Sequence, residues 1–368
     1  MKQLVTITAL LIFAIAFPQK PGTWYSFDEK VQGESLQGSL RGFKDGIGNV
    51  KIEPKFTGFT MATRFDDLIA VTEETDGKWD SYYLLKDGTK FGKDSLFVFD
   101  FSFDCESEGF IKFHDRKNDK VGMFGKNGKV AIPAVYNAMS KFKNGIAVAL
   151  AGAEKVHMKH DHSDCDHWYY DGGIYYLINT NNEILIENFK PGEEIDYHSM
   201  QVSTEESTDE TRVSFEGIDG NYYSFTNNKK LFEKFLLEEI IKNISHNKLI
   251  EHSWPELIHS SPEGWVSEDS REFINNNFDV IAEILNSTND KSFEYSIEVD
   301  DNILCPDRMD SQFDHYRDNC GELDVARYPL MEIYINYKGH YETQKSFTFL
   351  KTEEGFKLLS LSLGSELK

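Results

Sequence analysis

A strand and turn pattern that recurs about every 40 residues is the feature that most constrains this sequence. Its clearest copy spans residues 120–150 and reads as two strands around an Asn127-Gly128 turn, a proline bend, and a third strand entered through Asn144-Gly145. Asn-Gly and Asp-Gly pairs provide the positive φ angles that a tight hairpin needs. Repeated units of this kind stack on their neighbours. We therefore expect an array of β-hairpin units, either an open solenoid or a propeller-like ring.

Turn residues place the other copies along the chain. Gly46, Gly88 and Gly128 each follow Asp or Asn, and they are separated by 42 and 40 residues. A fourth turn at Asn181-Asn182 lies 54 residues after Gly128. The excess length corresponds to an insert, which we place at residues 152–172.

Two further segments complete the expected repeat domain. In the second copy, the apolar residues from Leu96 to Phe103 predict one strand. A fifth hairpin at Asp219-Gly220 is either another copy or a closing cap. We therefore expect a repeat domain over residues 24–228.

The repeated residues resemble the unit of the WG-repeat family, a class of bacterial repeat proteins. The copy at 120–150 matches the family pattern at Gly122, Met123, Phe124, Asn127, Gly128, Val130, Ile132, Pro133, Tyr136, Phe142, Gly145, Ile146 and Ala147. The copy at 42–71 keeps Gly42, Phe43, Asp45, Gly46, Pro54, Phe56, Phe65 and Ala70. The resemblance covers residues 40–190, without the Trp-Gly pair of the family and without the Pro-x-Tyr/Phe bend in the second and fourth copies. It implies a β-rich array with an interaction role, and it brings no catalytic residues to this chain.

Residues 1–16 are predicted to be a signal peptide. A lysine precedes an apolar run from Leu4 to Ile15, and Ala14 and Ala16 provide the small residues of a signal peptidase site. Cleavage after Ala16 is favoured, and a cut near Gln19 is the alternative. The apolar run is shorter than the ~20 residues of a spanning helix. We therefore expect an exported chain, periplasmic, on the cell surface or secreted, with no membrane span after processing.

Four cysteines are present, Cys105, Cys165, Cys305 and Cys320, and disulfides form in exported proteins. Four cysteines allow three complete pairings. Cys305 and Cys320 lie close together in the sequence, so we expect that pair, with Cys105 and Cys165 as the second. Free buried thiols are the alternative.

The insert carries the side chains that most suggest metal chemistry, namely His157, His160, His162, Cys165 and His167. Imidazole and thiolate groups at spacings of two to three residues can bind Zn²⁺ or Cu²⁺. The spacing matches no defined zinc module, and Cys165 can instead be oxidised. A solvated loop between two strands is the competing interpretation.

The apolar spacing becomes helical after Leu231, and a second helix is expected after Asp269-Ser270. Strand-like runs then follow up to Leu363. Helices followed by a strand meander predict an α+β domain over residues 231–368. This layout, with its Gly355-Phe356-Lys357 sequence, is similar to nuclear-transport-factor-like domains, which implies a pocket between a curved sheet and the helices.

Composition and motifs exclude several function classes. A formal net charge of -23 argues against nucleic-acid binding, because phosphates are held by clustered Lys and Arg. The phosphate-binding loop, the dinucleotide fingerprint, the nucleophile elbow and the His-Glu-x-x-His motif are all missing from the sequence. Candidate acid and base groups remain in the C-terminal part, at His252, His259, His315, Asp310, Asp314 and Asp318. Aspartate is abundant throughout this chain, so we expect a protein that is not an enzyme.

Three functional hypotheses follow from these observations. The preferred one is a binding protein whose repeat surface holds another protein or a cell-envelope polymer, and it predicts an exposed apolar groove on the repeats. The second is a small-molecule or enzymatic pocket within residues 231–368, with convergent polar groups. The third is metal binding, for which at least three of the five insert ligands must converge.

Overall fold

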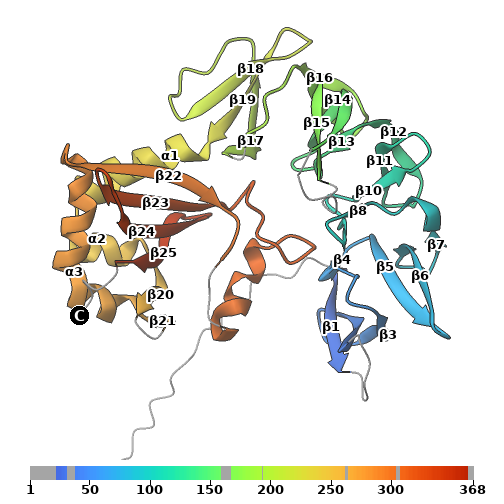
Figure 1. Cartoon of the computed structure of the whole chain (residues 1–368), viewed down its shortest axis with the longest axis horizontal. Coiled ribbons are helices and arrows are strands. Elements are labelled where there is room, and N and C mark those ends of the chain that lie inside the picture. The colour runs from blue at the N-terminus through green and yellow to red at the C-terminus, as the bar shows by residue number, and fades with distance from the viewer. Residues whose placement is uncertain are drawn as a thin grey trace, which may run out of the picture.

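The computed structural model describes residues 22–30, 38–158, 167–192, 194–261, 264–303 and 307–363, except the side chains of residues 307–309 and 341–343. The predicted signal peptide, residues 1–16, lies outside these ranges. The chain is mostly β, as expected. In the described part, no helix combines the length and the apolar character needed to cross a membrane. Figure 1 shows the N-terminal sheets following one another around an arc, with the C-terminal sheet and helices opposite them.

The first sheet has the strand order β4-β1-β2-β3-β5-β6-β7. β3 and β5 meet at the pair Phe56–Glu73, so the sheet divides into two smaller meanders, β1-β2-β3 and β5-β6-β7. Its strands are β1 (Trp24–Lys30), β2 (Ser39–Asp45), β3 (Val50–Phe56), β4 (Arg64–Phe65), β5 (Leu68–Thr75), β6 (Lys78–Leu85) and β7 (Lys90–Phe91). A short 3-10 helix, η1 (Lys93–Ser95), follows.

The next sheets along the arc are a β8-β9 hairpin and the antiparallel sheets β10-β11-β12, β13-β14-β15-β16 and β17-β19-β18. Their strands are β8 (Val98–Phe99), β9 (Ser102–Phe103), β10 (Phe110–Asp115), β11 (Lys120–Gly125), β12 (Val130–Tyr136), β13 (Ala138–Met139), β14 (Ile146–His157), β15 (Trp168–Asn179), β16 (Ile184–Glu187), β17 (Ile195–Ser203), β18 (Arg212–Glu216) and β19 (Tyr222–Asn227). The predicted insert extends the β14–β15 hairpin, whose strands pair as far as His157 and Trp168.

One type of turn closes a hairpin in each meander. Gly128 N donates to Gly125 O and Gly125 N donates to Lys129 O, and the same pair of hydrogen bonds recurs at residues 45–49, 85–89, 179–183 and 217–221. The residues with positive φ in these turns are Gly48, Gly88, Gly128, Asn182 and Gly220. They follow one another at intervals of 40, 40, 54 and 38 residues.

The first of these turns corrects the predicted turn glycine from Gly46 to Gly48. The Asp45 carboxylate accepts hydrogen bonds from the backbone N–H groups of Ile47 and Asn49. This arrangement places Gly48, with φ of 93°, at the left-handed position. Glycine occupies that conformation without steric cost.

Two meanders also share their strand register. The three Cα pairs between β2 and β3 recur between β11 and β12 at positions 80 residues later. A Cβ atom on Gly42 would lie 2.7 Å from Ile52 O, and one on Gly122 would lie 2.5 Å from Ile132 O. Real Cβ atoms do not approach so closely, so the close contact of the two strands requires glycine at both positions.

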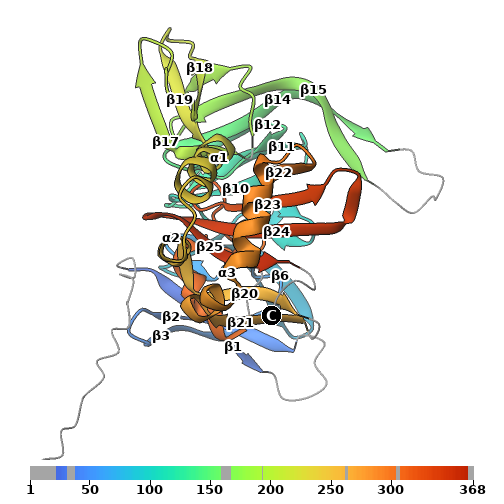
Figure 2. The same cartoon turned by 90° about the vertical axis from the view of Figure 1, so that its left-hand side faces the viewer.

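The C-terminal part contains one sheet of order β21-β20-β25-β24-β23-β22, in which β20 and β25 are parallel. Figure 2 shows α1 and α3 in front of this sheet. The elements are α1 (Asn228–Phe235), the π-helical segment η2 (Leu236–Ile241), α2 (His246–Glu251), β20 (Ser253–Ser261), β21 (Gly264–Asp269), α3 (Ser270–Asn286), η3 (Ser287–Asn289), β22 (Phe293–Asp300), η4 (Asp307–Tyr316), β23 (Leu330–Tyr337), β24 (His340–Thr352) and β25 (Gly355–Ser362).

Side-chain caps fix where the helices begin. The side chains of Asn227, Ser245 and Asp269 each accept a hydrogen bond from the backbone N–H three residues later. These bonds satisfy donors that have no partner within the helix. The helix predicted after Asp269-Ser270 is therefore α3.

The helices pack on the sheet through fully buried side chains, among them Phe232, Ile274, Ile333 and Phe347. The resemblance to nuclear-transport-factor-like domains implied a pocket between the helices and the sheet. The buried side chains of this core fill that space. The apolar residues of β23 that point toward the helices alternate with polar ones on the other face.

Residues 314–326, called the closure segment below, cross from the C-terminal part to the arc. Asn319 O accepts hydrogen bonds from Thr63 N, at 2.8 Å, and from Arg64 N, at 3.3 Å. Lys141 pairs with Asp318 and Lys143 pairs with Asp324, each at 2.7 Å. The C-terminal part therefore closes the arc into a ring (Figure 1).

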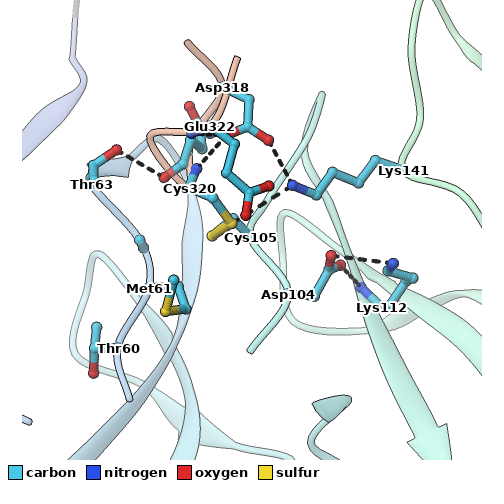
Figure 3. The surroundings of a disulfide bond; sticks show 12 residues. Thr60, Met61, Thr63, Asp104, Cys105, Lys112, Lys141, Asp318, Cys320 and Glu322 are labelled. Atoms are coloured by element: carbon cyan, nitrogen blue, oxygen red, sulfur yellow. Dashed lines mark hydrogen bonds and ion pairs between the residues drawn. A yellow bond between two sulfur atoms is a disulfide. The ribbon is translucent and has the colours of Figure 1, made fainter. Parts of the chain in front are cut away.

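A disulfide between Cys105 and Cys320 joins the closure segment to the N-terminal sheets (Figure 3). The predicted pairs Cys305–Cys320 and Cys105–Cys165 are therefore wrong. Proximity in the sequence favoured Cys305–Cys320, but the chain returns to its N-terminal half and brings together cysteines with a sequence separation of 215. Cys165 and Cys305 lie outside the described residues.

Candidate functional site

A groove of about 800 Å³ lies on the N-terminal sheets, where three separate segments meet. The β8–β9 hairpin forms one side, the β10–β11 hairpin forms the floor, and the extended β14–β15 hairpin forms the other side. The groove is lined by aromatic residues together with charged ones, among them Phe99, Trp168, Asp119 and Lys155.

Residues 98–103 are called the aromatic hairpin below, and Val98, Phe99 and Asp100 of this hairpin line the first side of the groove. Phe97 and Phe103 pack against the interior, whereas Phe99 and Phe101 between them point to solvent and are 69% and 83% exposed. Asp100 and Phe101 form the turn with φ of 46° and 60°. Two central residues with positive φ are the signature of the tightest hairpin turns, in which Asn-Gly is usual.

Phe101 is the unusual member of this turn. A bulky residue in the left-handed region is a conformational outlier, because its Cβ crowds the following carbonyl oxygen. The strand predicted from Leu96 to Phe103 is therefore wrong, since it reverses direction at Asp100-Phe101. The sequence signal that could have identified the hairpin is the run of alternating phenylalanines around a single aspartate.

The β14–β15 hairpin presents aromatic rings from the opposite side. The Lys155 ammonium lies 4.1 Å from the centre of the Trp168 ring, and the edge of Trp168 meets Tyr170 at 5.0 Å between ring centres. The Tyr170 hydroxyl donates to Asn137 O at 2.9 Å. The Asn137 side chain in turn bonds both backbone groups of Ala153. These contacts hold the aromatic wall in one arrangement.

A charged cluster occupies the floor of the groove. Asp119 bonds His114 Nε2 at 2.9 Å and pairs with Lys155 Nζ at 3.1 Å. The hydrogen bond from His114, and then that from Lys155, lower the pKa of Asp119. Asp119 is therefore a carboxylate at neutral pH, and it is held between His114 and Lys155.

The predicted metal ligands lie beside this groove as far as they are described. His157 ends β14 opposite Trp168, and His167 O accepts a hydrogen bond from Met158 N. His160, His162 and Cys165 lie outside the described residues. His157 and His167 therefore stand at the paired ends of one hairpin, with the other three predicted ligands between them in the sequence.

One other group has metal-ligand spacing in the part of the chain that the structure covers. It consists of Asp318, Cys320 and Glu322. Because Cys320 is bonded to Cys105, it has no thiolate to offer a metal.

The candidate acid and base residues of the C-terminal part have separate partners. His315 Nε2 bonds Glu353 at 2.8 Å, His259 Nε2 lies 3.5 Å from Glu268, and Asp318 pairs with Lys141. Burial lowers the pKa of His252, so this imidazole is neutral at physiological pH. The geometry among the described residues gives these groups no common reaction centre.

Comparison with protein families, curated proteins and solved structures found no match to this chain.

Proposed function

We propose that this chain is an exported, non-catalytic binding protein whose repeat surface holds another protein at the groove. The observation that carries the proposal is Phe101, which directly follows the groove residue Asp100 and is a bulky residue at positive φ with 83% of its surface exposed. Neither burial nor backbone preference accounts for an aromatic ring in this place. Strained residues persist where function needs them, and a bound partner would bury the ring.

The chemistry of the groove favours a protein partner. Aromatic side chains offer a large contact area with few rotatable bonds, and they are enriched at the centres of protein interfaces. Phe99 supplies that area on one side of the groove and Tyr169 supplies it on the other. Phe101, at the turn next to the groove, adds a further exposed ring. The Asp119–Lys155 pair supplies polar contacts between them. We infer a partner that presents an apolar segment flanked by polar groups.

The fold supports the same proposal. The five equivalent turns and the shared register support the interpretation of residues 24–228 as WG-like repeats. The helices and sheet of residues 231–368 support an α+β domain. We infer that the C-terminal domain closes the repeat array, in place of a further repeat. The disulfide is compatible with export.

Site-specific photo-crosslinking tests the proposal directly. A photoreactive phenylalanine analogue replaces Phe99 or Tyr169, one position on each side of the groove. The matched controls are Phe59 and Trp79, which are also exposed aromatic residues of the repeats but do not line the groove. We expect one discrete protein adduct in the native cells from both groove positions and none from the controls.

Two outcomes would contradict a protein partner. Equal labelling from all four positions would mean that the exposed rings make only nonspecific contacts. The second outcome combines two results: the groove variants give no crosslink, and the wild-type chain sediments with purified cell-envelope polymer. Together these results would assign the groove to the polymer instead.

Metal binding by the insert is the second candidate. The specific observation in its favour is that β14 and β15 bring His157 and His167 to the paired ends of one hairpin. Together with His160, His162 and Cys165 they would bind Zn²⁺ or Cu²⁺. Metal content and melting of the wild type, compared with a variant whose four insert histidines are alanine, test this candidate. Equal metal content and equal melting of the two would reject it.

A small-molecule pocket in the C-terminal part is the remaining candidate, and one of the cavities there suits it. This cavity of about 220 Å³ lies on the sheet face opposite the helices, and Trp265, Tyr334, Thr348 and Ser360 are among the residues that line it. Convergent hydroxyl groups beside one aromatic ring suit a small polar ligand.

A further inference from the structure

Three polar side chains from distant parts of the chain meet at the start of α1. Lys351 of β24 donates from Nζ to Asp196 Oδ2 of β17 at 2.7 Å and to Asn228 Oδ1 at 2.9 Å. Asn228 is the first residue of α1. This group is called the lysine trio below, and its residues are not among those that line the groove.

The lysine trio is buried and held in place. Asn228 has no exposed surface, Asp196 is 7% exposed, and the side chain of Lys351 is 16% exposed. Asn228 N donates to Glu194 O at 2.7 Å. His198 N donates to Asp196 Oδ1 at 2.9 Å. Groups that are held in contact in this way react as if they were present at a very high concentration.

The surroundings of the lysine trio are apolar on one side. One turn after Asn228, α1 carries Phe232 on the same face. Two residues before Lys351, β24 carries Phe349 on the same face, and the rings of Phe232 and Phe349 lie 5.2 Å apart. The trio therefore borders the helix–sheet core.

The amide group of Asn228 is only half satisfied. Its Oδ1 accepts from Lys351, but its Nδ2 has no hydrogen-bond partner among the described residues. Buried polar groups are almost always paired, so an unpaired amide nitrogen calls for an explanation. A reaction that releases this nitrogen provides one.

Asp196 gives Lys351 a proton acceptor in direct contact. An ammonium group has no lone pair, so Lys351 becomes a nucleophile only after Nζ has lost a proton. Asp196 Oδ2 is placed to take that proton. Burial disfavours charged groups, and it therefore favours the neutral amine and carboxylic acid that this transfer produces.

We propose that the lysine trio is a self-modifying site, at which Lys351 and Asn228 become joined by an isopeptide bond. Lys351 Nζ attacks Asn228 Cγ, the Nζ–Cγ bond forms, and the Cγ–Nδ2 bond breaks. Asp196 passes the proton that Nζ gives up to Nδ2, which leaves as ammonia. One amide replaces another, so the reaction needs no oxidant and no further reactant. The bond fastens α1 to β24, and it does not depend on the function proposed for the groove.

Peptide mapping of the purified, reduced full chain tests the proposal. Trypsin cuts after lysine and arginine, so an unmodified chain releases fragments 213–229 and 346–351 separately. Because trypsin does not cut after a modified lysine, we expect fragments 213–229 and 346–357 as one joined species. Its mass should be lower than the sum of the two fragments by one ammonia, about 17 Da.

Two results of this map would overturn the proposal. One is a chain in which the separate fragments predominate. The other is a joined species that contains Asp196 in place of Asn228 and has lost water, about 18 Da.

Two variants test the role of Asp196. Asp196→Asn removes the proton acceptor with little change of shape, and we expect the joined species to disappear. Asp324→Asn is the matched control, because it removes the carboxylate from another lysine pair of the same length, 2.7 Å to Lys143, and should keep the joined species. A joined species that persists in Asp196→Asn would contradict this role. If Asp196→Asn does not fold, the wild-type map alone decides whether the bond exists.

Discussion

Cys105 and Cys320, whose sequence separation is 215, are covalently joined, and this bond ties the last third of the chain to its first third. Around it, Lys141 pairs with Asp318 (Figure 3). Asn319 O also accepts a hydrogen bond from the backbone N–H of Thr63. The bond therefore lies in a contact that the fold also makes by hydrogen bonds and ion pairs.

Removing this disulfide should destabilise the whole ring. A bond that closes so long a loop restricts the unfolded chain strongly, and its loss typically costs about 2–5 kcal/mol of unfolding free energy. Urea unfolding of the Cys105→Ser/Cys320→Ser variant against wild type measures the change. Mass mapping of the unreduced protein should recover the linked Cys105 and Cys320 peptides. A variant as stable as the wild type would show that the other closure contacts suffice.

Glu106 should give the protein a specific pH dependence. The residue is 3% exposed, and its carboxylate accepts hydrogen bonds from Asp67 N and Leu68 N. Burial raises its pKa from 4.5 to about 7. Between these values the folded chain keeps a proton that the unfolded chain has released. The free energy of unfolding therefore falls as pH rises through this window, by about 3 kcal/mol.

Glu106→Gln isolates this effect from the other titrating groups. Glutamine keeps an oxygen that can accept both backbone N–H groups, but it does not titrate. Urea unfolding at pH 5 and at pH 8 measures the effect. The free energy of unfolding should fall more between these two pH values in the wild type than in the variant. Parallel losses in the two proteins would contradict the raised pKa.

Local chemistry decided which parts of the fold could be predicted. Asp-Gly and Asn-Gly pairs marked the turns at Gly88, Gly128 and Gly220, because the positive φ angle is a property of the pair itself. The first turn was placed two residues early, since both Gly46 and Gly48 can adopt that angle and the Asp45 hydrogen bonds select between them.

Long-range contacts decided the rest. The Cys105–Cys320 bond depends on how the closure segment crosses the ring, and no local pattern encodes that path. The groove combines the aromatic hairpin with Asp119 and Trp168, which only the folded chain brings together. The turn at Asp100-Phe101 was not predicted, because phenylalanine is sterically disfavoured at positive φ.

Gly122 should tolerate no side chain, unlike its neighbour on the same strand. In Gly122→Ala the new Cβ would lie 2.5 Å from Ile132 O, so β11 and β12 must separate, at a cost of about 1–3 kcal/mol. Gly125→Ala is the matched control, since its Cβ would make an ordinary 3.4 Å contact with Ala131. Thermal unfolding of both variants checks the difference. Equal melting would mean that the strand contact is looser than described.

Phe101→Gly should separate binding from folding. Glycine accepts the φ of 60° without strain, and the ring that it removes is 83% exposed. Relief of the left-handed strain offsets the greater entropy of glycine in the unfolded chain, so the unfolding free energy should change by less than about 1 kcal/mol. Loss of an aromatic ring that the partner buries should cost about 2 kcal/mol or more of binding free energy. Crosslinking from the photoreactive residue at position 169 should therefore fall strongly in this variant and stay unchanged in Phe59→Ser. A stable Phe101→Gly variant with undiminished crosslinking would remove the reason for assigning Phe101 to a partner.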